Sequence, residues 1–216
     1  MENYTVNDIS VQEKDEDMAR VLVSTVHTSD SIFLLANKLS ADRIYLIKDR
    51  KPEDDLQEKS VAEIKRTLGK VIEIKEKSVD HLDAVSSATE VVELIDAIPN
   101  KDEIYINITS GKKPKALGVL LAAYKRWDRI KKIFYVPWES KNPVILPILP
   151  FKVTKSQLRI LEEIEDNQNV AELADKLGIT RAMAYRSIKA LKDMGLIEVA
   201  EGKGYQLTDA GRVARL

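Results

Sequence analysis

Residues 104–124 read IYINITSGKKPKALGVLLAAY and contain, in order, a strand, a polar loop and an apolar helix. The segment Ile104–Ile108 has the short apolar run of a buried strand. The loop supplies hydroxyls, one glycine and two lysines, and Pro114 stands at the favoured first position of the helix. A strand followed by a helix is the repeating unit of an α/β protein.

The same alternation extends in both directions from this unit. Further strands are predicted at Val21–Val26, Ile44–Ile47, Val71–Ile74 and Ile133–Val136. Helices are predicted through Ile32–Leu39, Leu56–Leu68 and about Leu82–Ile98. Short apolar strands between helices indicate a parallel sheet covered on both faces, and the handedness of the crossovers makes it doubly wound and Rossmann-like. In the common strand order 3-2-1-4-5, strands one and four are neighbours.

A proline-rich stretch separates this region from the rest of the chain. The prolines are Pro137, Pro143, Pro147 and Pro150, with one short strand, Val144–Leu146, among them. Proline stiffens a connection and blocks helix, so we predict an α/β domain over residues 1–150 and a second domain over residues 151–216. Residues 1–17 are polar and charged, and we expect either a disordered arm or an added edge strand.

Beyond residue 150 the apolar residues follow a helical period. Thr154 is a good N-cap for a first helix. Residues 170–191, VAELADKLGITRAMAYRSIKAL, predict two helices joined by a tight turn at Gly178, with Thr180 capping the second. Two short strands around Gly202–Gly204 then form a wing. The overall expectation is a Rossmann-like α/β domain followed by a small winged helix-turn-helix.

The second of these helices has the charge pattern of a recognition helix. The chain has a net charge of −1, so nucleic-acid binding depends on local placement. From Thr180 to Lys192 there are four cations and no acid, as a helix in a major groove requires. The predicted DNA-binding residues are Thr180, Arg181, Met183, Tyr185, Arg186, Lys189 and Lys203. The segment resembles the winged helix-turn-helix of MarR-like regulators; the alternative is a protein–protein module.

Composition excludes several other classes of protein. The chain has no cysteine and two histidines, so we expect neither a disulfide framework nor a metal site. Its apolar runs are too short to span a bilayer, and its N-terminus lacks the pattern of a signal peptide. We therefore expect a cytoplasmic protein without a membrane partner, and we assign no catalytic residue and no cofactor.

The loops after strands one and four form the predicted ligand site. At neighbouring strands they would line one crevice, where α/β sheets bind ligands. The second loop opens a helix, whose N-terminus and lysines favour an anion. The predicted ligand-binding residues are Thr25, His27, Thr28, Ser29, Asn107, Thr109, Ser110, Gly111, Lys112 and Lys113. The loop is not a P-loop, because Ile106 and Lys113 occupy positions that such a loop reserves for Gly and Ser or Thr.

The second loop and the first strand also resemble the two motifs of CARF domains. With the winged helix, residues 18–211 are similar to the CARF-winged-helix transcriptional regulators of archaeal CRISPR systems. The resemblance implies a homodimer that binds double-stranded DNA and an effector, a cyclic oligoadenylate, with cyclic tetra-adenylate suiting two copies of Lys112 and Lys113.

Two alternatives to this regulator remain. One is a metal-independent ring nuclease that uses Thr25, Ser110 and Lys113, and the other is a dimeric DNA-binding protein without a ligand. His27 is either a satisfied loop residue or a ligand contact. Trp127 and Trp138 are predicted to be core or interface residues.

Overall fold

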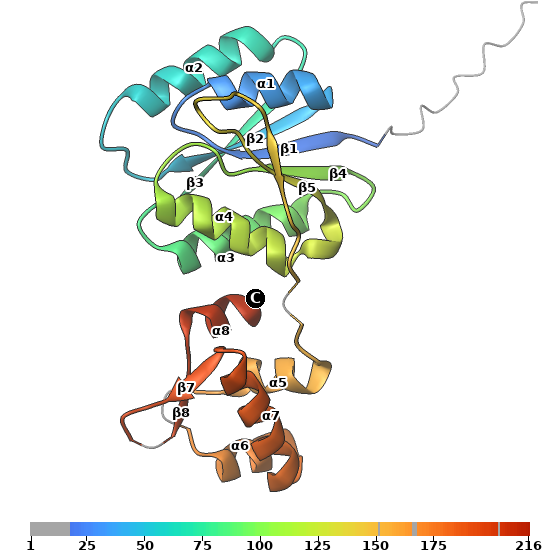
Figure 1. The fold of residues 1–216 in the computed structure, drawn as a ribbon, viewed down its shortest axis with the longest axis vertical. Helices are drawn as coiled ribbons and strands as arrows, with labels where there is room; N and C mark the ends of the chain where they lie inside the picture. The colour runs from blue at the N-terminus through green and yellow to red at the C-terminus, as the bar shows by residue number, and fades with distance from the viewer. Residues whose placement is uncertain (1–17, 151, 166–167, 203) are drawn as a thin grey trace, which may run out of the picture.

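The computed structural model describes residues 18–150, 152–165, 168–202 and 204–216, arranged as an α/β part and a smaller helical part (Figure 1). The strands of the α/β part are β1 (Arg20–Thr25), β2 (Arg43–Asp49), β3 (Glu73–Val79), β4 (Glu103–Asn107), β5 (Ile130–Tyr135) and β6 (Val144–Leu146). Its helices are α1 (Asp30–Leu39), α2 (Leu56–Leu68), α3 (Ala84–Ala97), α4 (Lys113–Lys125) and the 3-10 turn η1 (Trp127–Arg129).

The sheet has the order β3-β2-β1-β4-β5-β6, so the predicted order of the first five strands is confirmed. These five strands run parallel, and β6 pairs antiparallel with β5. The predicted Rossmann-like fold is therefore confirmed, with β6 added at one edge. The carboxyl ends of β1 and β4 lie side by side, because Ser24 pairs with Asn107.

Both faces of the sheet are covered, as Figure 1 shows: α1 and α2 lie on one face, and α3 and α4 on the other. Alternate residues of β1 explain why. Val21 and Val23 are fully buried in a cluster with residues of α3 and α4, whereas Leu22 is buried in a cluster with residues of α1 and α2. A strand that is apolar at every position can bury both of its sides in this way.

Two local predictions need correction, and a third is narrowed. The third strand was expected at Val71–Ile74, but Val71 is exposed and β3 begins at Glu73. This strand forms the sheet edge, where charged residues are tolerated and the apolar pattern is weak. Helix α4 begins at Lys113, so Pro114 is its second residue. Trp127 and Trp138, predicted to be core or interface residues, are 50% and 67% exposed, which excludes the core and leaves the interface as their prediction.

The helical part is a winged helix-turn-helix. It contains α5 (Lys155–Glu163), α6 (Val170–Leu177), α7 (Arg181–Asp193), β7 (Ile197–Val199), β8 (Tyr205–Leu207) and α8 (Asp209–Ala214). Thr154 caps α5 in a capping box with Gln157, and Thr180 caps α7, both as predicted. Gly178 ends α6 with φ of 63°, a left-handed conformation that glycine adopts without steric cost. The short helix α8 was not predicted.

Helix α8 brings the end of the chain against the α/β part, where it lies beside α3 and α4. The Lys125 ammonium donates to the carbonyl oxygen of Ala214 at 2.5 Å, and Arg126 donates to that of Leu216 at 3.3 Å. Leu216 also packs against the apolar cluster under α3 and α4. Among the described helices, none has the length and apolar composition that a bilayer crossing requires.

Candidate functional site

A cavity of about 310 Å³ opens at the carboxyl ends of β1 and β4. It is lined by Thr28, Asp30, Ser31, Leu34, Thr109, Ser110, Tyr135, Val136, Trp138 and Lys141. These residues come from the loops after β1, β4 and β5, from the last residue of β5 and from the first turn and a half of α1. The loops after strands one and four therefore meet at one cavity, as the strand order predicted, but only some of the predicted residues reach it.

Asn107, the last residue of β4, holds this end of the sheet together. Its fully buried amide nitrogen donates to the hydroxyl oxygens of Ser24, at 2.9 Å, and Ser31, at 3.2 Å. Its carbonyl oxygen accepts from the Thr109 hydroxyl at 2.5 Å, and Thr109 Oγ1 in turn accepts from the backbone N–H of Val136 at 2.8 Å. One side chain thus connects β1, α1, β4 and the loop after β5, which places it as a scaffold beneath the cavity.

Thr28 and Ser110 join the two loops at the cavity wall. The backbone N–H of Thr28 donates to Ser110 Oγ at 2.9 Å, and the two hydroxyl oxygens are 3.4 Å apart. Residues separated by 82 positions in the sequence therefore present their hydroxyls at the same point. A hydroxyl both donates and accepts, so this pair suits the oxygens of a ribose or phosphate.

Three other predicted residues face elsewhere. The hydroxyl of Thr25 is fully buried and donates to the carbonyl oxygen of Asn107 at 3.4 Å. Ser29 is buried and donates to a Glu63 carboxylate oxygen on α2 at 2.6 Å. His27 is half-buried, and its backbone carbonyl accepts from Ser60. The ring-nuclease alternative needs Thr25, Ser110 and Lys113 at one site. Of these three residues, only Ser110 lines the cavity.

Gly111 and Lys115 form the base of the second loop. Gly111 has φ of 97°, which a side chain would strain, and its Cβ position lies 2.9 Å from the Lys115 ammonium nitrogen. This nitrogen donates to the Val26 carbonyl at 3.0 Å and to the carboxylate of Asp49. Lys115 therefore ties the end of β1 to the end of β2 directly beneath Gly111.

Lys115 is fully buried, and the sequence analysis missed it. Burial lowers the pKa of its ammonium group, and the hydrogen bond to Asp49 opposes that shift. A lysine in the first turn of a helix resembles a surface residue in sequence, so only the fold shows that this one serves as a buried cross-link. Gln57 Nε2, beside this ion pair, is buried without a hydrogen-bond partner among the described residues.

The two lysines predicted to bind an anion lie at the start of α4, outside the cavity wall. Lys112 forms a 2.5 Å ion pair with Glu53, and this hydrogen bond raises the pKa of its ammonium group. Lys113 is exposed. Helix α4 has no acid in its first turn, and the N–H groups there lack intrahelical acceptors, so its N-terminus favours an anion.

The end of β5 and the loop after it supply a cavity wall that the sequence analysis did not assign. Tyr135, Trp138 and Lys141 all line the cavity. The Lys141 ammonium lies 3.5 Å from the centroid of the Trp138 ring and 3.1 Å from the carboxylate of Asp30. The closely spaced prolines made this segment look like a linker in the sequence. The aromatic residues Tyr135 and Trp138 were the signal that could have indicated a binding site here.

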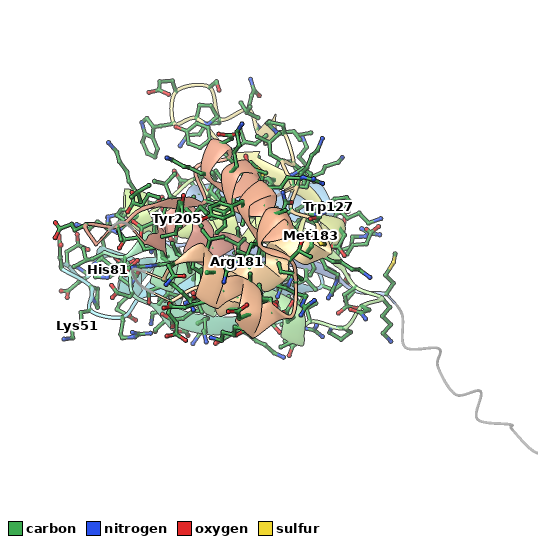
Figure 2. The ribbon with its side chains drawn as sticks, turned by 90° about the horizontal axis from the view of Figure 1, so that it is seen from below. Lys51, His81, Trp127, Arg181, Met183 and Tyr205 are labelled. Atoms are coloured by element: carbon green, nitrogen blue, oxygen red, sulfur yellow. The ribbon has the colours of Figure 1, made fainter. Side chains whose placement is uncertain are left out.

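The predicted DNA-binding residues lie on helix α7 and around it. Ala184, Ile188 and Leu191 are buried on one side of this helix. The other side exposes Arg181, Met183, Tyr185, Arg186 and Lys189. Figure 2, which views the molecule from the winged-helix end, shows Arg181 and Met183 on the side turned away from the α/β part. Lys203 lies outside the described residues.

The cations of α7 are free of carboxylates in the described part of the chain, where Arg181, Arg186 and Lys189 form no salt bridge. Lys176 instead pairs with two acids at and just beyond the end of α5, Glu163 at 3.1 Å and Glu165 at 2.9 Å. Thr180 holds the start of the helix by accepting from the backbone N–H of Met183.

Comparisons with known proteins match both parts of the chain. The family model HFX_2341_N, described as an N-terminal domain, matches residues 20–141. A helix-turn-helix family model, HTH_11, matches residues 156–206. The α/β domain followed by a helix-turn-helix domain, predicted from the resemblance to CARF-winged-helix regulators, is thereby confirmed. A comparison with curated proteins finds no match.

Several solved structures are similar to the chain at low identity. Protein VC1899 from Vibrio cholerae has a TM-score of 0.50 and 13% identity, over 91% of this chain and 64% of that one. A type III CRISPR defence DNA nuclease activated by cyclic oligoadenylate gives 0.48 and 13%, over 82% and 30%. Enterococcus italicus Csm6 bound to cyclic hexa-2′-fluoro-hexa-dAMP gives 0.47 and 15%, over 82% and 55%. The chain thus spans less than two thirds of each of these proteins, and the first likeness shows the fold alone.

Proposed function

The chain belongs to the HFX_2341_N family, and from this premise we propose that it is a DNA-binding transcription regulator controlled by a cyclic oligoadenylate. The proposal rests on the presence, in one chain, of two features that are suited to anionic ligands. One is the hydroxyl-lined cavity beside the N-terminus of α4, and the other is the carboxylate-free cationic face of α7.

Helix α7 is proposed to lie in the major groove of duplex DNA. Its N-terminal half exposes Arg181, Met183 and Tyr185, the positions from which a recognition helix reaches base edges. Arg186 and Lys189 follow on the exposed side and are placed for phosphates. Because no carboxylate among the described residues neutralises them, they can release counterions when DNA binds.

The α/β domain is proposed to bind the effector as a homodimer, which is what the CARF resemblance implies. Each copy offers the hydroxyls of Thr28 and Ser110 and the start of α4 with Lys112 and Lys113. Two copies related by a two-fold axis would present four lysines to one ligand. A cyclic tetra-adenylate has four phosphates and a two-fold axis, so it would match such a dimeric site in charge and symmetry.

Calorimetry on the full chain tests this ligand. We expect one cyclic tetra-adenylate bound per dimer, with light scattering on the same sample reporting the dimer. Each charge-assisted phosphate contact contributes roughly 1.5–3 kcal/mol, so replacing Lys112 and Lys113 by alanine should weaken binding at least about a hundredfold. Lys38, the basic residue at the opposite end of α1, is a matched control whose replacement should leave ring affinity unchanged.

Two results would contradict this proposal. If the wild-type chain binds no cyclic oligoadenylate, the proposed effector is wrong. If the double variant binds as tightly as the wild type, Lys112 and Lys113 do not belong to the ligand site. In either case the assignment of α7 to DNA is judged separately, by gel shift with duplex DNA.

A further inference from the structure

The segment Pro137–Lys141 forms a closed turn over the cavity. The backbone N–H of Lys141 donates to the carbonyl oxygen of Pro137 at 3.0 Å, and Lys141 has φ of 54°, a left-handed conformation that is uncommon outside glycine. Its ammonium group is held between the Asp30 carboxylate and the ring of Trp138. These contacts fix a residue in an unfavourable conformation, as happens at functional sites.

Trp138 is the largest apolar side chain at this turn, and it is left 67% exposed. The Lys141 ammonium group lies over its ring face, 3.5 Å from the centroid. Tyr135, 42% exposed, lines the same cavity with Leu34. The cavity therefore has an aromatic wall that remains partly in water, together with the hydroxyl floor of Thr28 and Ser110.

The volume and lining of the cavity select a chemical class of occupant. About 310 Å³ is at the lower limit of small-molecule sites, so the cavity accommodates one planar ring system with part of its sugar, not a whole cyclic oligonucleotide. The face of an aromatic side chain stacks well on a nucleobase. The hydroxyl of Ser31 accepts from Asn107 and keeps its own proton for donation to a ring nitrogen.

We propose that this cavity is a nucleobase subsite, in which one base of the ligand stacks on Trp138 after displacing the Lys141 ammonium group from the ring. The inference rests on the proposed function, because it assigns one base of the effector to each copy of the chain. Ser110 lines the cavity and lies three residues before the start of α4, so a base in the cavity places its phosphate beside that helix N-terminus.

The two tryptophans of the chain make the proposal measurable by fluorescence. Trp127→Phe leaves Trp138 as the only indole, and Trp138→Phe leaves Trp127, which lies at the opposite end of the sheet in η1. Stacking should quench the emission of Trp138 in the first variant when cyclic tetra-adenylate is added. The emission of Trp127 in the second variant should stay unchanged under the same titration.

Affinity provides the second readout. Trp138→Ala should weaken binding of the ring at least about fivefold for each stacked base, whereas Trp127→Ala should bind as the wild type does. Because Trp138 is exposed, its replacement should leave the unfolding midpoint unchanged, so a loss of affinity would report the site itself. Trp138→Phe, which keeps an aromatic face, should recover part of the affinity.

The outcomes separate this inference from the proposed function. If calorimetry shows ring binding but Trp138 is not quenched and Trp138→Ala binds equally well, the base subsite is wrong and the regulator proposal stands. If no ring binds, the effector is wrong, and millimolar 5′-AMP is then compared with ribose 5-phosphate in the Trp127→Phe variant. Quenching by AMP alone supports the base subsite, and an absent or equal response overturns it.

Discussion

Lys112 and Lys113 beside the cavity and the cations of α7 were all predicted to bind anionic ligands, but their surroundings in the structure differ. Near the cavity, Lys112 is paired with Glu53, Lys113 is exposed, and Lys115, which was not predicted, is buried against Asp49. On α7, Arg186 and Lys189 are exposed and have no carboxylate partner among the described residues. Helix α7 therefore presents all of these cations before any ligand binds, whereas near the cavity Lys112 and Lys115 already have carboxylate partners and only Lys113 is exposed.

This contrast predicts different electrostatics for the two ligands. A face with free cations binds a polyanion with a steep dependence on salt, because counterions are released. At the cavity, Lys112 must exchange its carboxylate partner for a phosphate, and the site gains more of its affinity from hydroxyls and stacking. We accordingly expect ligand binding by the α/β domain to depend on salt less steeply than DNA binding.

The largest effect should come from the buried lysine. Lys115→Ala leaves the Asp49 carboxylate buried without its partner, which typically costs about 3–5 kcal/mol of unfolding free energy. Lys113→Ala, two residues earlier and exposed, should change the unfolding free energy by less than about 0.5 kcal/mol. Urea denaturation measures both, and equal small effects would show that Lys115 is not the cross-link between β1 and β2.

The next effect concerns DNA. Replacing Arg186 and Lys189 by alanine should weaken duplex binding and flatten the dependence of log K on log salt by about two, if each contacts one phosphate. Lys176→Ala is the matched control, since that lysine is engaged by Glu163 and Glu165. A salt slope that is the same in the double variant and the wild type would mean that α7 is not the DNA-contacting helix.

The smallest effect should come from freeing Lys112. Glu53→Gln removes its carboxylate partner without shortening the side chain, so the lysine can bind a ligand phosphate without that exchange. An exposed ion pair is worth less than about 1 kcal/mol, so ring affinity should rise by a few-fold at most. Glu58→Gln on α2, which loses a pair with Lys48 of β2, should leave ring affinity unchanged. A fall in affinity with Glu53→Gln would contradict the exchange.

The parts of the fold that were predicted correctly are those that depend on residues close together in the sequence. The strand–loop–helix unit from Ile104 onward, the cap at Thr180 and the turn at Gly178 all depend on local chemistry. Strand order followed from general rules for parallel sheets. The third strand was misplaced because its charges, Lys75 to Lys77, are tolerated at a sheet edge that only the assembled sheet defines.

The candidate site was less predictable, because its features depend on contacts between distant residues. Thr28 and Ser110 were predicted and do meet, but Thr25 turned out to be buried below the cavity. Lys115 lies 66 residues from Asp49, and the aromatic wall at Trp138 comes from a segment that looked like a linker. Side-chain direction and long-range pairing decide such roles, and a single sequence carries little information on either.

The central claim is that ligand binding in the α/β domain changes DNA binding by α7. The most direct test measures the affinity of the full-length chain for its duplex operator, without and with saturating cyclic tetra-adenylate. We predict a change of about five-fold or more in DNA affinity, and an equal change in ring affinity when DNA is present, because coupling is reciprocal. Identical DNA affinity with and without the bound ring would contradict the account.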